Sequence, residues 1–353
     1  MKAKDLAKKL GVSPATISLV LNNKPGISDS LRHSLLEKIR ELGCENMLSS
    51  STALPRENQD SSPQSRPVIV YLIYTNFDED NDRFAFYPAV LEGAEMEARD
   101  SHYNLVVLHM SYQGNRNLKR LVEDTGNAVG AIVQTYHITD AMLADLESLG
   151  IPCVFVDTYR PDRNVCSVCV NNEQGIFAAV EYLKNMGHQN LGYVYSGKSN
   201  DSLLERRRCF HQALREYGLA DRRENYFTAG DAADAEEFDI LRELFRSAEH
   251  MPTALVAEND RLAWRAMKAL QREGLKIPQD ISIIGFDDRS ICTMVEPNLT
   301  SVRNYRHLMG RECVAMLRNL QRNKKLGFHI PSLKLELPTA LIPRDSVRDL
   351  TKE

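Results

Sequence analysis

From residue 66 to residue 341 the chain alternates between short apolar runs and stretches with helical periodicity, and this alternation most constrains its fold. Runs such as 68–74 (VIVYLIY) and 151–157 (IPCVFVD) are almost continuously apolar, as expected for strands buried on both faces. Strands that alternate with helices form parallel sheets with helices on both faces. The sequence therefore predicts an α/β fold with doubly wound parallel sheets.

The alternation runs through two series. In the first, strands are expected at 68–74, 104–110, 129–134 and 151–157, with helices at 87–101, 115–124 and 140–149. In the second, strands are expected at 167–170, 191–196, 254–258 and 281–287, with helices at 172–186, 203–217, 235–247 and 260–273. A helix at 306–323 and a strand at 333–341 close the chain. Two similar series predict two lobes with a cleft between them: lobe 1 at about 67–160 plus 291–325, and lobe 2 at about 161–290 plus 326–345.

The first 47 residues have a different pattern, which predicts a small domain of three short helices. Leu6 and Leu10 lie on one face of a first helix, and Gly11 suits the left-handed position after a helix end. Ser13 is a good N-cap for a second helix, and Pro14 suits its first position because the N–H that proline lacks would be unpaired there. A third helix carries an apolar stripe of Leu31, Leu35, Ile39 and Leu42.

Two helices joined by a short turn that contains glycine form the helix-turn-helix arrangement, whose second helix can enter the major groove of DNA. Hydroxyl groups there can contact phosphates, and outward side chains can contact bases. The residues expected at the DNA are Ser13, Pro14, Ala15, Thr16, Ser18, Leu19 and Asn22. The alternative is a three-helix interaction module that binds no nucleic acid.

The distribution of charge favours DNA over that alternative. The whole chain has 44 Lys and Arg against 48 Asp and Glu, a net charge of −4. Residues 1–48 contain 8 basic and 5 acidic residues, a net charge of +3, so the remaining residues carry −7. A polyanion would be attracted to the basic end of the chain and repelled by the acidic remainder.

Residues 48–66 separate these two parts of the chain. They are rich in Ser, Pro, Gln and Asn and poor in large apolar residues. This composition is typical of a linker or hinge. We therefore expect a helix-turn-helix domain at 1–47, a linker at 48–66 and a two-lobed ligand-sensing and dimerisation domain at 67–353.

Several classes of protein are disfavoured. The sequence has no G-x-G-x-x-G, P-loop or G-x-S-x-G pattern, and its nine histidines do not cluster at ligand spacing, so we expect no catalytic residues, cofactor or metal. Cys166 and Cys169 form a lone C-x-x-C and are better explained as ordinary strand cysteines.

No apolar run is long enough for a membrane span, and no signal peptide is visible. The odd count of seven cysteines favours a reducing cytoplasm.

The N-terminal stretch resembles the DNA-binding domain of the lactose-repressor/galactose-repressor family through KDLAKKLGVSPATIS, VLNN and ISDSLRHSLLEKIRELG. The resemblance continues in the body through FYPAVLEGAEMEA (86–98), VNNEQGIFAAVEYLKNMGHQNLGYV (170–194), IPQDISIIGFDD (277–288) and PNLTSV (297–302). It implies a cytoplasmic homodimeric repressor that binds a palindromic double-stranded DNA operator. It also implies a body like that of periplasmic sugar-binding proteins, with a small-molecule effector, expected to be a sugar, in the cleft between the lobes.

The resemblance also assigns ligand contacts to individual positions. Phe86 and Tyr87 match an aromatic pair that stacks on ligands, and Arg206 matches an arginine that clamps a carboxylate or sugar hydroxyls. Asp287, in GFDD, matches a carboxylate that accepts hydrogen bonds from the ligand. The complete expected set is Phe86, Tyr87, Gln134, Tyr136, Ser202, Arg206, Asn259 and Asp287.

Two alternatives remain. A solute-binding protein without a role in gene control would share the two lobes, but it predicts a secretion signal and no basic head. An enzyme on an α/β scaffold would need a nucleophile, a phosphate loop or a metal cluster.

One departure from the family has no explanation in the sequence, since Arg265 occupies a position that is usually small.

The outward face of the second helix predicts the base preference of the head. Leu19 stands where many relatives carry arginine, and Pro14 and Ala15 stand where specificity is set. Leu and Ala cannot form a bidentate contact to guanine, but they can touch the methyl group of thymine. Selection of binding sites from random duplexes should therefore return half-sites with an A·T-rich core. A central G·C step as the strongest determinant would contradict this expectation.

Overall fold

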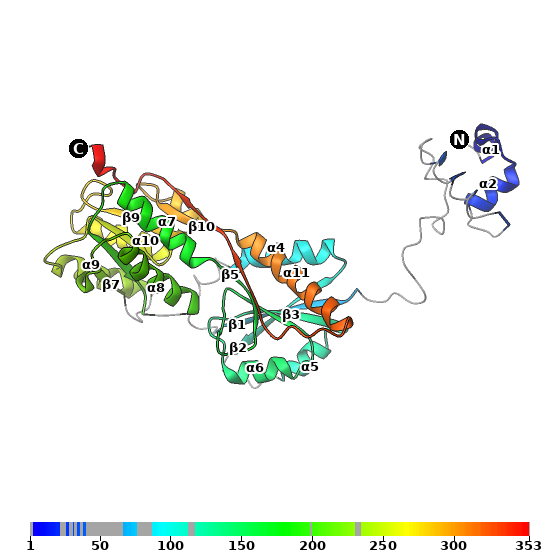
Figure 1. Ribbon diagram of the computed structural model, residues 1–353, viewed down its shortest axis with the longest axis horizontal. Helices are drawn as coiled ribbons and strands as arrows, with labels where there is room; N and C mark the ends of the chain where they lie inside the picture. The colour runs from blue at the N-terminus through cyan, green and yellow to red at the C-terminus, as the bar shows by residue number, and fades with distance from the viewer. Residues whose placement is uncertain are drawn as a thin grey trace. The chain divides into compact units, whose positions relative to one another are not determined.

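The computed structural model describes residues 3–21, 26, 27, 31, 34, 35, 38, 39, 66–75, 87–111, 117–197, 200–229 and 234–352 (Figure 1). Its contacts divide it into two compact units, Met1–Gln64 and Ser65–Glu353, which we call the head and the body. Apart from Arg66, the linker expected at 48–66 lies outside the described residues. A search of the described helices finds none that is both long and apolar enough to cross a membrane.

The head contains α1 (Ala3–Leu10) and α2 (Pro14–Leu21), joined by a turn at Gly11, whose φ of +67° is left-handed. Its described core consists of the buried side chains Leu6, Ala7, Ile17, Val20, Leu35 and Ile39. The third helix is present at residues 31, 34, 35, 38 and 39. Leu31 does not join the expected apolar stripe, because it is 42% exposed and lies one turn before the buried Leu35. Leu42 lies outside the described residues.

The first sheet of the body has the strand order β11-β5-β4-β3-β1-β2, and every pairing in it is parallel. Its strands are β1 (Val68–Thr75), β2 (Asn104–Ser111), β3 (Ala128–Gln134), β4 (Cys153–Val156), β5 (Cys166–Val170) and β11 (Leu333–Leu337). The helices of this lobe are α4 (Tyr87–Asp100), α5 (Leu118–Glu123), α6 (Asp140–Glu147) and α11 (Arg306–Lys325). Figure 1 shows α4 and α11 on one face of the sheet, and α5 and α6 on the other.

The second sheet has the order β12-β10-β9-β8-β6-β7, with β12 antiparallel to β10. Its strands are β6 (Leu191–Tyr195), β7 (Tyr226–Thr228), β8 (Ala254–Ala257), β9 (Ser282–Asp287), β10 (Thr300–Asn304) and β12 (Thr339–Ile342). The helices of this lobe are α7 (Asn172–Asn185), α8 (Asp201–Glu216), α9 (Asp234–Ser247) and α10 (Asp260–Arg272). Residues from α7 and α8 pack in one core cluster, and residues from α9 and α10 pack in another. Two doubly wound α/β lobes are therefore present, as the sequence predicts.

The chain changes sheet at different residues from those expected. The run at 167–170 does not open the second series, because β5 pairs with β4 and completes the first sheet. The connection from β4 to β5 contains no helix, so the alternation gave no sign that the two strands are neighbours. Lobe 1 therefore extends to Val170 instead of 160. The second part of lobe 1 was expected to begin at 291, but the unexpected strand β10 keeps residues up to Asn304 in lobe 2. The short strand β7 was also not expected.

The expected closing strand at 333–341 is two strands in different sheets. β11 pairs with β5 in the first sheet and β12 pairs with β10 in the second. Pro338 separates them, and since proline has no N–H to donate to a strand ladder it breaks the run at that point. Within the described residues the chain thus passes between the sheets three times, near residues 171, 305 and 338.

Helices α4 and α11 cross at two glycines. A Cβ atom on Gly93 would collide with the backbone of His307, and one on Gly310 would collide with the carbonyl oxygen of Val90. The two backbones are therefore in direct contact, which only glycine permits. This contact fixes α11, which follows the second passage between the lobes, against the first sheet.

Gly93→Ala should force α4 and α11 apart. Overpacking against a rigid backbone should lower the free energy of unfolding by about 3 kcal/mol, more than alanine gains in helix propensity. Urea unfolding followed by circular dichroism measures the change. Met96→Ala, at a partly exposed position of the same helix, is the control and should stay within about 0.5 kcal/mol of wild type. A neutral or stabilised Gly93→Ala variant would show that the crossing has room for a methyl group.

Candidate functional site

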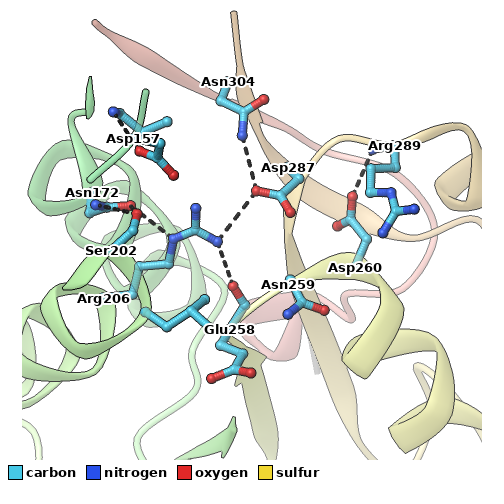
Figure 2. Close-up of polar contacts among 12 residues, drawn as sticks. Asp157, Asn172, Ser202, Arg206, Glu258, Asn259, Asp260, Asp287, Arg289 and Asn304 are labelled. Carbon is cyan, nitrogen blue, oxygen red and sulfur yellow. Dashed lines mark hydrogen bonds and ion pairs between the residues drawn. The ribbon is translucent and has the colours of Figure 1, made fainter. Parts of the chain in front are cut away.

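Polar side chains of the body gather where the carboxyl ends of the strands meet the passages between the lobes (Figure 2). Asp157 follows β4, Glu258 follows β8, Asp287 ends β9 and Asn304 ends β10. The first turns of α7 and α8 and the N-terminus of α10 complete the group with Asn172, Ser202, Arg206, Asn259 and Asp260. In open α/β sheets ligands bind at this end of the strands.

Arg206 lies at the centre of this group and is 2% exposed. Its Nε donates a hydrogen bond to Asn172 Oδ1 at 2.8 Å, and its Nη1 donates to the backbone oxygen of Glu258 at 2.7 Å (Figure 2). Nη1 also lies 3.3 Å from Asp287 Oδ1, and the guanidinium stacks 3.8 Å from the centre of the Phe286 ring. Three fixed polar contacts and one aromatic face hold this guanidinium in a single orientation.

The helix that carries Arg206 begins so that this arginine is the one buried within the group, whereas Arg208 lines the cavity beside it. Asn200 caps α8 by accepting a hydrogen bond from Leu203 N at 2.8 Å, which places Ser202 and Arg206 one turn apart on the inner face. Arg207 stacks on the Tyr195 ring instead, and the side chain of Arg208 is exposed. The structure therefore brings the expected Ser202 and Arg206 to the same site.

Asp287 and Asn304 form the opposite side of the group. Asp287 has a φ of +107° and accepts a hydrogen bond from Asn304 Nδ2 at 3.0 Å (Figure 2). Asn304 Oδ1 is buried and has no hydrogen-bond partner among the described residues. A buried amide oxygen without a partner is costly, so a ligand or water that donates a hydrogen bond there would be stabilised. Asn304 was not expected as a site residue, because the strand that positions it was not predicted.

Asn172 and Asp157 connect the group to the first passage between the lobes. Asn172 Nδ2 donates to Ser202 Oγ at 3.0 Å and to Glu205 Oε2 at 2.7 Å. Asp157 Oδ1 accepts a hydrogen bond from Val170 N at 3.1 Å, so this carboxylate links the end of β4 to the end of β5. A cavity of about 350 Å³ opens beside Asp157, Asn172 and Ser202, and this volume is at the small end of ligand sites.

Asn259, which was expected to contact the ligand, caps a helix. Its Oδ1 accepts a hydrogen bond from Leu262 N at 2.9 Å and so caps α10. The neighbouring Asp260 accepts hydrogen bonds from Arg289 N and from Ser301 Oγ. The oxygen of Asn259 is thus committed to the helix, and its amide nitrogen is the part that remains for a ligand.

The expected residues of the first lobe lie at the carboxyl ends of its strands. Tyr87 begins α4 and is half-buried. Gln134 ends β3 and is buried, and its Oε1 accepts a hydrogen bond from Tyr71 Oη at 3.0 Å. Tyr136 packs edge-on against His137 with the ring centres 4.9 Å apart. Phe86 lies outside the described residues.

Burial shapes the electrostatics of the group. It raises the pKa of Glu258 to about 7, against the opposing effect of the two hydrogen bonds that Ser196 donates to Glu258 Oε1. It raises the pKa of Asp157 to about 6, although Arg206 favours the charged form, and it raises the pKa values of Asp260 and Asp287 as well. Four buried carboxyl groups thus lie in this group, of which Asp287 pairs directly with the Arg206 guanidinium, and Arg289 and Arg306 also act on Asp287.

Arg265 has a clear role outside this group. Its side chain forms an ion pair with the fully buried carboxylate of Glu237, which also pairs with Arg261 at 3.0 Å. A carboxylate buried to this degree needs cationic partners. The unexpected arginine on α10 therefore neutralises Glu237 of α9 and joins these two helices.

In the head, α2 presents the expected DNA-facing residues. Ser13 Oγ accepts a hydrogen bond from Thr16 N at 3.0 Å and lies 2.8 Å from Thr16 Oγ1, so both hydroxyls are engaged in the cap. Pro14, Ala15 and Ser18 are exposed, and Leu19 is half-buried. Asn22 lies outside the described residues. The exposed face of α2 thus consists of small side chains and carries few polar groups.

The head and the body each match a known family. Residues 2–44 match the family described as bacterial regulatory proteins, lacI family, and residues 180–347 match the periplasmic binding protein-like domain. Catabolite control protein A of Priestia megaterium is 28% identical over 93% of this chain and 95% of its own length. The HTH-type transcriptional repressor CytR of Escherichia coli (strain K12) is 26% identical over 98% of this chain and 96% of its own length.

Solved structures share the fold over nearly the whole chain. The transcriptional regulator CelR–cellobiose complex has a TM-score of 0.68 at 22% identity and covers 98% of this chain and 99% of its own. The Lac repressor dimer bound to operator and the anti-inducer ONPF has a TM-score of 0.67 at 21% identity and covers 99% of both chains. At these identities the likeness establishes the fold.

The raised pKa of Glu258 predicts a pH dependence of stability. Between pH 4.5, the ordinary pKa of this group, and about pH 7, the folded protein holds a proton that the unfolded chain has released. The free energy of unfolding should therefore fall as the pH rises through this window. Glu258→Gln keeps an oxygen that accepts from Ser196 and removes the charge, so it should flatten this fall and leave the variant up to about 3 kcal/mol more stable than wild type at pH 8.

Urea unfolding at pH 5 and pH 8 measures the difference. Glu249→Gln, at an exposed position, is the control and should retain the dependence of wild type. Equal slopes for Glu258→Gln and wild type would show that Glu258 is charged in the folded protein throughout this range.

Proposed function

Because the chain belongs to the lacI family of bacterial regulatory proteins, the lactose-repressor/galactose-repressor family, we propose that it represses transcription. It binds a palindromic operator as a homodimer through its head, and a small effector in the cleft of the body changes its affinity for the operator. The observation that carries this proposal is the presence in one chain of a helix-turn-helix and a two-lobed body with a buried polar site.

The head supports DNA binding through the structure of α2. This helix has a capped N-terminus, and its exposed residues Pro14, Ala15 and Ser18 lie where a reading helix contacts base edges. One helix of this length contacts too few bases for specific binding, so a two-fold protein on a two-fold site is the expected arrangement. The Lac repressor is a dimer on its operator, and we extend that arrangement to this chain.

The body supports an uncharged polyhydroxylated effector, such as a sugar. Buried carboxyl groups outnumber the guanidinium of Arg206, and Asp287 already neutralises that guanidinium. An uncharged ligand needs no counter-charge here, because Arg206 and Asp287 already pair with each other. A hydroxyl group can donate to Asp287 or Asn304 Oδ1 and accept from Arg206, so it suits both kinds of partner. CelR, which shares the fold, binds cellobiose.

We place this activity in the cytoplasm, where bacterial DNA lies. The cysteines of the described residues support this placement, because Cys153, Cys166, Cys169, Cys209, Cys292 and Cys313 are all free thiols. Cys166 and Cys169 are buried in β5, as expected for strand cysteines.

The proposal is tested on the full chain with an operator selected from random duplexes. Its affinity should change at least tenfold with one member of a panel of uncharged sugars, a coupling of about 1.4 kcal/mol. Arg206→Ala and Asp287→Asn should abolish this response, with folding checked by circular dichroism, and a folded variant should keep the operator affinity that wild type has without sugar. Affinity should also fall steeply with salt, because Lys and Arg contacts to phosphates release counterions.

Arg215→Ala is the matched control, since this arginine is exposed on the same helix as Arg206 and should leave the response intact. A response to phosphorylated sugars alone would contradict the effector class. A chain that binds a sugar but selects no operator would instead be a solute-binding protein without a role in gene control.

A further inference from the structure

A second cavity, of about 590 Å³, lies in the first lobe at the end of the sheet opposite to the polar site. It is bounded by α6, by the starts of β4 and β5, by the end of α11 and by residues 327–331. The polar site lies at the carboxyl ends of the strands, whereas Cys153 and Cys166, which begin β4 and β5, line this cavity. The two sites are therefore separate.

The interior of this cavity is apolar. Leu146, Phe155, Val165 and Leu320 line it and are buried, and the half-buried Ile330 closes one side. At the rim, the ring of Phe328 is 65% exposed. The volume lies well within the range of small-molecule sites, which are mostly apolar and carry a few polar groups. An apolar ligand would remove the lining and the Phe328 ring from water.

A basic helix turn stands beside the rim of this cavity. The last turn of α11 contains Arg322, Lys324 and Lys325, and Lys324 lines the cavity. The Lys324 ammonium has three donors, one of which is used on Gly150 O at 3.0 Å. Glu147 is the one carboxylate among the described residues of the lining. Within the lining, Lys324 balances Glu147, and Arg322 and Lys325 of the same helix turn add positive charge beside the cavity without lining it.

We propose that this cavity binds an amphipathic anion, a carboxylate with an alkyl or arylalkyl tail, with the tail inside and the carboxylate at Lys324. The apolar lining accounts for the tail and the basic turn for the head group. Residues 327–331, which form one wall, lead into β11 and from there through Pro338 into the second lobe. A ligand here therefore contacts a segment that continues across the passage between the lobes. The inference is independent of the sugar proposed for the polar site.

Isothermal titration of the full chain with alkyl carboxylates, each below its critical micelle concentration, tests the proposal. Octanoate, nonanoate and decanoate should bind with a Kd that tightens about fourfold per added methylene, as burial of the tail requires. Decanoate should bind more tightly than decanol and much more tightly than decyltrimethylammonium. Lys324→Met should weaken decanoate about threefold to fivefold and leave decanol unchanged.

Lys325→Met is the matched control, because Lys325 is in the same turn and does not line the cavity, and it should leave the Kd within twofold of wild type. Leu143→Trp and, separately, Ile330→Trp should fill the cavity and abolish binding, with folding checked by circular dichroism.

Several results would overturn the proposal. Absence of binding for every alkyl probe would exclude a ligand site for such tails. Full binding by a folded Leu143→Trp or Ile330→Trp variant would place the ligand elsewhere. Equal affinities for decanoate and decanol that do not respond to Lys324→Met would refute the role of the charge.

Discussion

The contacts of the Arg206 guanidinium are the interaction on which the body of this protein depends. One side chain from α8 joins the start of α7 through Asn172, the end of β8 through the oxygen of Glu258, and the end of β9 through Asp287. Removing a buried cation from among buried carboxyl groups would leave them uncompensated, which is far more costly than the loss of one surface ion pair. The same contacts that support the second sheet also fix the orientation of this guanidinium, so under the proposed function stability and effector recognition depend on one set of atoms.

The polar site is rich in hydrogen-bond acceptors because of the arrangement around Arg206. Positive φ values at Asp157 and Asp287 turn these two carboxylates toward the ends of the strands, where backbone and side-chain donors partly compensate them. Burial still raises the pKa values of both carboxyl groups, because these donors offset only part of the cost of burying a charge. A ligand that supplies hydroxyl donors would complete the hydrogen bonds without adding charge. This is the physical reason for proposing a sugar rather than an anion as the effector.

Much of the fold could be predicted because periodicity is a local property. The helices from α4 to α11 were expected near their observed places, and most strands were apolar runs of the expected length. What could not be predicted is the neighbour of each strand. The placement of β5 depends on a connection without a helix, and β10 is a short polar-edged run, TSVRN, with no strong apolar signal. In the site, Arg206 and Asp287 could be assigned from a resemblance. Asn304 could not, because its position depends on β10. Glu258 contributes a backbone oxygen, which no pattern of side chains indicates.

The three passages between the sheets have a consequence for synthesis. The first sheet needs β11, and its α4 face needs α11, yet both segments follow the whole of β6 to β10 in the chain. A ribosome therefore releases a nearly complete second lobe while the first lobe still lacks an edge strand and a covering helix. Domains that are continuous in sequence can fold one after another during translation. Here the N-terminal lobe must wait for the C-terminal segment, so the α4 face of its sheet lacks a covering helix until the chain beyond residue 306 has emerged.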